Sequence, residues 1–187
     1  MKGSVLLLPT LLIALGSGCF IFALWLSAYS DPSIRWLHFF QAWMYLVTLG
    51  LLVRQVRWGY FIGLSAAVFW DYANLFVTTF FISGLHWVGS WVNTGRLQHL
   101  DQMVAVPAWI GNFFVIVGCV WGYTQLREKR PTDIARFLVA FVLTTGFFAI
   151  DIALCQPRYL PLFRAILHPH YPRVVKRVHD QALRFPK

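Results

Sequence analysis

The stretch GLSAAVFWDYANLFVTT, which runs from Gly63 to Thr79, places one acidic residue in the middle of an apolar segment. An aspartate at the centre of a membrane-spanning helix costs roughly 2.5–3.5 kcal/mol on insertion scales, so we expect Asp71 to face protein or water and not lipid. On a helix, residues spaced by three and four positions share one face. We predict that the small and polar face of this stretch is buried, and its members are Gly63, Ala67, Asp71, Asn74 and Thr78.

The composition is that of an integral membrane protein. Of the 187 residues, 58% are hydrophobic and only 12% are charged, and the mean hydropathy is +0.61. Apolar runs long enough to span a bilayer follow one another, and the charged residues lie in the gaps between them. The sequence therefore predicts a multi-pass membrane protein and excludes a soluble globular domain.

The apolar runs predict an all-α fold, a polytopic transmembrane helix bundle with five spanning helices. Between the third and fourth helices lies the longest gap, residues 86–102, which we expect to form an interfacial segment because its tryptophan rings favour the headgroup region. A basic C-terminal surface tail, residues 156–187, follows the bundle of residues 1–155. The predicted spanning helices cover residues 4–29, 36–53, 58–85, 103–126 and 133–155.

The formal charge of +9 does not indicate a nucleic-acid-binding protein. The basic residues lie at helix ends and in the tail, where lipid headgroups or an acidic subunit are their natural partners. The lysine and arginine residues of the amino end and the tight loops favour an amino terminus on the inner side of the membrane. The basic tail conflicts with that orientation after five spans, so both orientations stay open.

Polar residues of several helices are expected to meet toward one membrane face. In the second run, His38, Gln41, Tyr45 and Thr48 are spaced by three, four and three residues, which places them on one side of a helix. Because successive helices are antiparallel, the polar groups of four helices lie toward the face with the long loop and the tail. We predict a polar pocket that opens toward that face, with Asp71 at its floor. Its expected ligand-binding residues are His38, Gln41, Tyr45, Asp71, Asn74, Thr78 and Asn112.

Two classes of function fit such a pocket. The first is non-catalytic, either the binding of a small amphipathic ligand or lipid, or an accessory subunit of a larger membrane complex. The second is a membrane-embedded enzyme or proton-coupled transporter, in which His38 with Asp71 or Asp151 would supply the acid and the base. The sequence has no nucleophile elbow, HExxH motif or phosphate-binding loop. We therefore expect a binding or accessory role with membrane lipids as partners, and the sequence identifies no cofactor.

Two further interpretations of the polar residues stay open. Asp71 and Asn74 can form a buried hydrogen-bond cluster that holds the helices together, to which each interaction contributes roughly 0.6 kcal/mol in membrane bundles. A metal site would use His86, His99 and Asp101, or His168 and His170, because imidazoles and carboxylates are metal ligands. The spacing of these residues is not diagnostic of a metal site.

Overall fold

The computed structural model describes the backbone of residues 7–166 and the side chains of residues 7–163. Within this part of the chain, five helical segments are long and apolar enough to cross a membrane, as the sequence predicts. They are Leu7–Ser30, Pro32–Val53, Trp58–Val77, Leu100–Thr124 and Thr132–Cys155. These spans indicate a multi-pass membrane protein.

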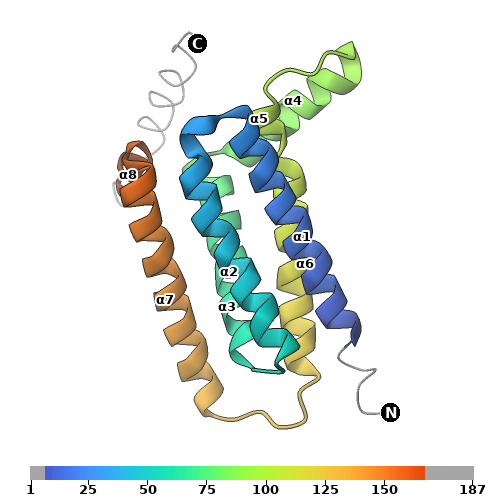
Figure 1. Ribbon diagram of the computed structural model, residues 1–187, viewed down its shortest axis with the longest axis vertical. Coiled ribbons are helices and arrows are strands. Elements are labelled where there is room, and N and C mark those ends of the chain that lie inside the picture. Colours follow the sequence, from blue (N-terminus) through green and yellow to red (C-terminus); the bar gives the residue numbers. More distant parts are fainter. Residues whose placement is uncertain (1–6, 167–187) are drawn as a thin grey trace.

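The spans are built from long helices with short helical extensions. The long helices are α1 (Leu7–Ser30), α2 (Arg35–Val53), α3 (Trp58–Tyr72), α6 (Ala105–Thr124) and α7 (Thr132–Cys155). The extensions are the 3-10 helix η1 (Pro32–Ile34), the π-helix η2 (Ala73–Val77) and the short α5 (Leu100–Met103). Outside the spans lie α4 (Phe80–Thr94), η3 (Pro157–Tyr159) and α8 (Leu160–Ile166). Figure 1 shows the long helices side by side, with α4 leaning away from them.

The third spanning helix is shorter than predicted. The apolar run predicts one helix over residues 58–85, but the span ends at Val77 and α4 begins at Phe80. The break lies at Thr79, whose φ of 56° is in the left-handed region that β-branched residues rarely adopt. A π-helical turn precedes it, in which Thr78 N donates to Ala73 O. Because the apolar run continues across the break, composition and periodicity do not reveal it.

The two segments expected at the membrane surface are largely helical where they are described. α4 covers the first half of residues 86–102 and ends at Thr94, and the following Gly95 caps it with a φ of 66°. Gly84 is the buried residue of α4, which packs on α6 through its first turns, where the Phe81 and Trp109 ring centroids are 4.9 Å apart. Of the predicted tail, residues 156–166 form η3 and α8, and residues 167–187 lie outside the described residues.

α1 packs most extensively against α6, and glycines allow the two backbones to approach closely. A Cβ atom on Gly16 would overlap with Gly111 O, and one on Gly111 would lie 2.7 Å from Gly16 O. Further along, a Cβ on Gly118 would lie 2.6 Å from the side chain of Ile13. Small residues of this kind are the usual means of close helix packing in membrane proteins.

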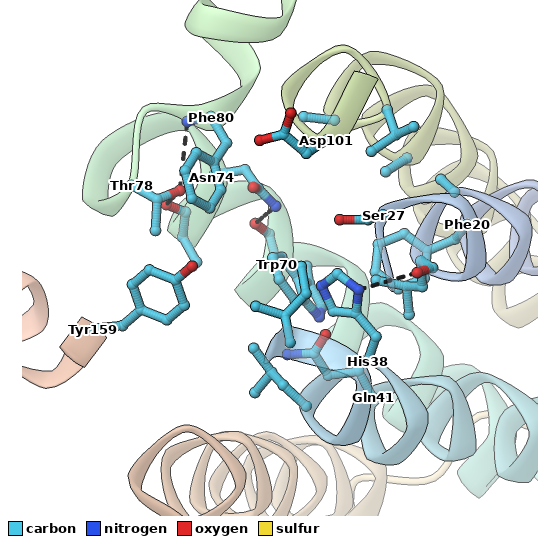
Figure 2. Close-up of a pocket in the computed structure, with 18 of the residues that line it drawn as sticks. Phe20, Ser27, His38, Gln41, Trp70, Asn74, Thr78, Phe80, Asp101 and Tyr159 are labelled. Atoms are coloured by element: carbon cyan, nitrogen blue, oxygen red, sulfur yellow. Dashed lines mark hydrogen bonds between the residues drawn. The ribbon is translucent and has the colours of Figure 1, made fainter. Parts of the chain in front are cut away.

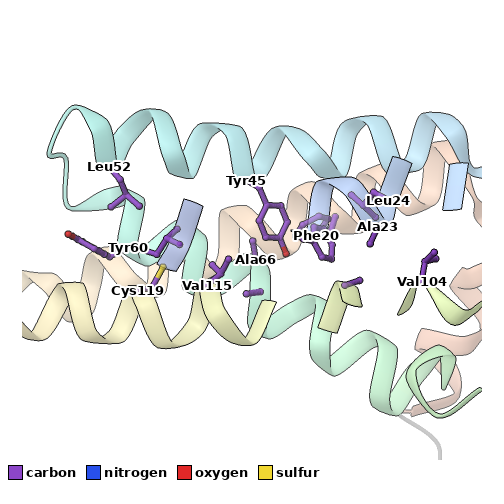
Figure 3. Packing of buried hydrophobic residues seen from close by; sticks show 14 residues of the cluster. Phe20, Ala23, Leu24, Tyr45, Leu52, Tyr60, Ala66, Val104, Val115 and Cys119 are labelled. Atoms are coloured by element: carbon purple, nitrogen blue, oxygen red, sulfur yellow. The ribbon is translucent and has the colours of Figure 1, made fainter. Parts of the chain in front are cut away.

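The hydrophobic core lies between α1, α2, α3 and α6, with α7 packed on the outside of α2 and α3. Figure 3 shows the core residues lining up along the long axis of the bundle. Phe20 of α1 stacks on Tyr45 of α2 with ring centroids 4.3 Å apart. From α7, Phe148 stacks on Phe69 with centroids 5.0 Å apart. These ring contacts fix the relative depth of the helices and thereby the positions of their polar side chains.

Candidate functional site

Both polar faces predicted from the sequence are buried in the structure. On α2, every member of the predicted face is at most 9% exposed, and these members are His38, Gln41, Tyr45 and Thr48. On the third span, the buried members are Gly63, Ala67, Asp71 and Asn74, and Thr78 is half-buried. Most of these polar side chains belong either to a hydrogen-bonded triad or to a cavity, whereas Thr48 donates to Met44 O at 2.8 Å.

Tyr45, Asn112 and Asp71 form the buried triad, which links α2, α6 and α3. Tyr45 Oη donates to Asn112 Oδ1 at 2.6 Å, and Asn112 Nδ2 donates to Asp71 Oδ1 at 3.0 Å. Tyr45 and Asn112 are fully buried, and Asp71 is 9% exposed. The expected hydrogen-bond cluster of Asp71 is thus present, but its partner is Asn112. Asn74 instead donates through Nδ2 to Trp70 O at 3.0 Å.

A cavity of about 140 Å³ lies toward the end of the bundle that carries α4, α5 and η3, the side predicted from the sequence. Figure 2 shows the polar side chains that surround it. The triad residues are not part of its lining, so the carboxylate of Asp71 does not form its floor as expected. This is because Asp71 points toward Asn112 on α6. Four of the predicted residues do line the cavity: His38, Gln41, Asn74 and Thr78.

The hydrogen bonds made within the protein fix the roles of two lining side chains. His38 Nδ1 lies 3.0 Å from Leu24 O. Because a carbonyl oxygen only accepts, Nδ1 carries the proton and Nε2 of the neutral ring is an acceptor. By the same reasoning, the bond from Asn74 Nδ2 to Trp70 O leaves Asn74 Oδ1 as a second acceptor. The cavity therefore has two fixed acceptor atoms in its wall.

Two buried polar atoms in the lining have no hydrogen-bond partner among the described residues. They are Oε1 of Gln41, a residue that is 1% exposed, and Nε1 of Trp70. A buried polar atom without a partner costs roughly 1–3 kcal/mol. Gln41 and Trp70 are therefore cavity-lining residues whose polar atoms are not fully satisfied by the described part of the protein.

Asp31 is a lining residue that the sequence analysis did not assign to the pocket. It begins η1, where its Oδ1 accepts from Ser33 N at 3.0 Å and its Oδ2 lies 3.7 Å from Arg158 Nη2. Partial burial tends to raise the pKa of Asp31, but hydrogen bonding with Ser33 and the charge of Arg158 outweigh it and hold the pKa below its usual value. The sequence Asp-Pro-Ser is typical of a helix start, and it could have placed this carboxylate near His38.

The rest of the lining comes from elements that are distant in sequence. These residues include Ser27, Trp70, Phe80, Asp101, Gln102 and Tyr159. Tyr159 belongs to the predicted surface tail, yet η3 packs against α7 and brings this ring to the cavity. No pattern in the sequence indicates that η3 packs against α7 and brings Tyr159 to the cavity.

Of the residues considered as metal ligands, His86, His99 and Asp101 belong to the described part of the chain. The described part of the chain contains no group of three or more His, Cys, Asp or Glu side chains that could hold a metal ion. The rings of His86 and His99 both pack against Trp87, with centroid distances of 5.5 and 4.1 Å. Asp101 lies in the cavity lining. His168 and His170 are outside the described residues.

The residues considered as acid and base are not joined to one another by a hydrogen bond within the described residues. His38 bonds to Leu24 O and Asp71 bonds to Asn112. Asp151 is 5% exposed on α7, and neither of its carboxylate oxygens has a hydrogen-bond partner in the described part. His38, Asp71 and Asp151 are thus three separate polar groups in the described part of the structure.

A cluster of ion pairs at the opposite end of the bundle was not predicted. It is centred on Asp133, which is 2% exposed at the start of α7. The carboxylate accepts hydrogen bonds from Arg130 N at 3.0 Å, Arg136 Nη1 at 3.0 Å, Tyr123 Oη at 3.3 Å and Arg57 Nη1 at 3.4 Å. These contacts join the α2–α3 link, the end of α6 and the start of α7.

Comparison of the chain with protein families, curated proteins and solved structures found no match. The function of this protein is therefore inferred from the geometry of its cavity.

Proposed function

We propose that this membrane protein binds a small amphipathic molecule in the cavity between α1, α2, the third span and α5. The observation that carries the proposal is the cavity itself, whose lining combines apolar side chains with the polar side chains of His38, Gln41 and Asn74. A volume of about 140 Å³ suits a ring-sized or short-chain group, since an engineered protein cavity of about 150 Å³ admits benzene.

The mixed chemistry of the wall supports an amphipathic ligand. Apolar side chains such as Phe20, Leu24 and Phe69 form much of the lining, and a few polar groups stand among them. Small-molecule sites commonly have this composition, because apolar contact supplies affinity and a few polar atoms fix the orientation.

The test uses a variant that fills the cavity and a matched variant that does not. Ala105 lines the cavity, so Ala105→Phe should occupy its space, whereas Ala153 is exposed on α7 and Ala153→Phe should leave the cavity open. Native mass spectrometry of the purified full chain should show a retained small molecule in the wild type and in Ala153→Phe, and its loss in Ala105→Phe. Equal retention in all three proteins would contradict the proposal.

A second candidate, an accessory subunit of a membrane complex, is favoured by α4. This helix leans away from the bundle (Figure 1) and exposes Ile82, Leu85 and Val92 by 58%, 48% and 71%. The same side chains suit the interfacial segment expected from the sequence. A photo-crosslinking amino acid at position 92 tests this in native membranes. One discrete protein adduct supports the subunit role, and adducts to lipid alone support an interfacial helix.

A further inference from the structure

We propose that the ligand of this cavity carries a primary ammonium group, which the carboxylate of Asp101 and the rings of Phe80 and Trp70 attract. This inference rests on the proposed function of the cavity and names the chemical class of its ligand. Three independent features of the wall support it: its charge, its aromatic rings and its free acceptor atoms.

The charge of the cavity wall is negative although the chain is strongly basic. The described lining residues include the carboxylates of Asp31 and Asp101 and no lysine or arginine. Arg158 compensates Asp31 from 3.7 Å, whereas Asp101 makes no ion pair with any described residue. Figure 2 shows the Asp101 carboxylate pointing toward the side of the cavity where Phe80 and Asn74 lie. A phosphate or sulfate would meet this carboxylate without a compensating cation.

The aromatic rings of the wall suit the same kind of ligand. An ammonium group near the face of a tryptophan or phenylalanine ring is attracted by the ring's electron distribution, most strongly when water is excluded. The Tyr159 ring already has a cation over it, since Arg158 Cζ lies 5.2 Å from its centroid. Phe80 packs edge-on against Tyr159, with centroids 6.1 Å apart and an interplanar angle of 85°. Of the other lining rings, Phe20 stacks on Tyr45, and Phe69 stacks on Phe148 and Phe163. Phe80 and Trp70 are thus the lining rings without a stacked partner.

The acceptor atoms in the wall distinguish a primary ammonium from a quaternary one. His38 Nε2 is an acceptor because Nδ1 of the neutral ring donates to Leu24 O, and Asn74 Oδ1 is an acceptor because Nδ2 donates to Trp70 O. The buried Gln41 Oε1 is a third acceptor without a partner among the described residues. A primary ammonium offers three N–H donors, and a quaternary ammonium offers none. The unpaired Nε1 of Trp70 is a donor and suits a hydroxyl or ether oxygen elsewhere on the ligand.

The test compares three probes with the same tail and different polar ends: octylammonium, octyl sulfate and octyl glucoside. Affinities are measured by calorimetry on the full chain in phosphatidylcholine nanodiscs. We expect octylammonium to bind at least about tenfold more tightly than octyl sulfate, because charge-assisted hydrogen bonds are the stronger ones. Because Asp101 is exposed and its charge is partly screened, Asp101→Asn should weaken octylammonium binding by about threefold and leave octyl glucoside binding unchanged, and Asp101→Glu should retain wild-type behaviour. Glu128→Gln removes a carboxylate at the far end of the bundle and is the matched control.

Failure of the inference and failure of the proposed function give different results. If the three probes bind equally, or if Asp101→Asn binds octylammonium as the wild type does, the ammonium inference is wrong. The proposed function still holds in that case if Ala105→Phe abolishes binding of all three probes. It is wrong if Ala105→Phe and a second cavity variant, Ser27→Leu, bind the probes as the wild type does.

The same assay separates two sources of an ammonium group, a lipid headgroup and a free amine. Phosphatidylethanolamine carries a primary ammonium and phosphatidylcholine does not. Replacing the second lipid by the first in the nanodisc should weaken the apparent affinity for octylammonium if the headgroup occupies the cavity. An unchanged affinity assigns the site to a free amine.

Discussion

Asn112 on α6 donates a hydrogen bond of 3.0 Å to the carboxylate of Asp71 on α3. The same side chain accepts a bond of 2.6 Å from Tyr45 on α2 through its oxygen. An amide is suited to this position because it combines a donor and an acceptor, whereas an ionised carboxylate only accepts. One fully buried side chain thereby links three helices.

Replacement of this amide should destabilise the protein. Asn112→Leu leaves the Tyr45 hydroxyl and the Asp71 carboxylate without their partner, and we expect a loss of about 1–3 kcal/mol in the free energy of unfolding. Asn93→Leu, at an exposed position of α4, is the matched control and should cost much less. Denaturant titration followed by circular dichroism measures both. Equal losses in the two variants would show that the triad does not hold the helices together.

Two glycines in α1, two positions apart, should respond differently to the same substitution. A Cβ on Gly16 would overlap with the backbone of Gly111, whereas a Cβ on Gly18 would meet no atom within 4 Å. We expect Gly16→Ala to lower the unfolding temperature, because α1 and α6 must separate to admit the methyl group. Gly18→Ala should leave the unfolding temperature unchanged or raise it, since alanine favours the helix more than glycine does. A similar decrease in both variants would contradict the close approach of α1 and α6.

The contribution of Asp31 to stability should depend on pH. Its folded-state pKa is lowered, so this contribution is present above the unfolded-state pKa of about 3.9 and is lost as the pH falls through the folded-state value. Asp31→Asn keeps a capping side chain but removes the charge. At pH 7 we expect a small loss, at most about 1 kcal/mol, because the Asp31 side chain is 39% exposed and its ion pair is screened. Unfolding curves of the variant and the wild type should converge in acid, and a pH-independent difference would exclude the charge as the cause.

The ion pairs of Asp133 should matter more than those of the neighbouring Glu128. Asp133 is buried and accepts four hydrogen bonds, whereas the Glu128 side chain is 76% exposed and its two ion pairs measure 3.9 and 4.0 Å. Asp133→Asn should therefore lower the unfolding temperature clearly, and Glu128→Gln should hardly change it. Thermal unfolding in one detergent compares the two variants directly. A larger effect of Glu128→Gln would contradict the assigned cluster.

The sequence predicts the helical fold and the buried faces because both depend on local periodicity. Residues such as Gln41 and Tyr45 on one helix, or Ala67 and Asp71 on another, share a face by spacing alone, and the structure buries all four. The antiparallel order of the helices also places the cavity toward the correct end of the bundle.

The partners of the polar residues depend on contacts that no local pattern records. Asp71 and Asn112 are 41 positions apart, and Tyr45 and Asn112 are 67 positions apart. Which of several polar groups at a similar depth will pair depends on helix rotation and on ring packing in the core. The break at Thr79 was missed for a related reason, since an unusual backbone angle leaves the hydrophobic pattern unchanged.

The pairing of Gly16 with Gly111 also has a consequence for how the chain is made. Ribosomes add about 5–20 residues each second, so roughly 5–20 s separate the synthesis of these two glycines. During that interval, α6 is not yet present to cover the surface of α1 that contains Gly16. The close contact between α1 and α6 therefore forms only after the fourth span has been synthesised.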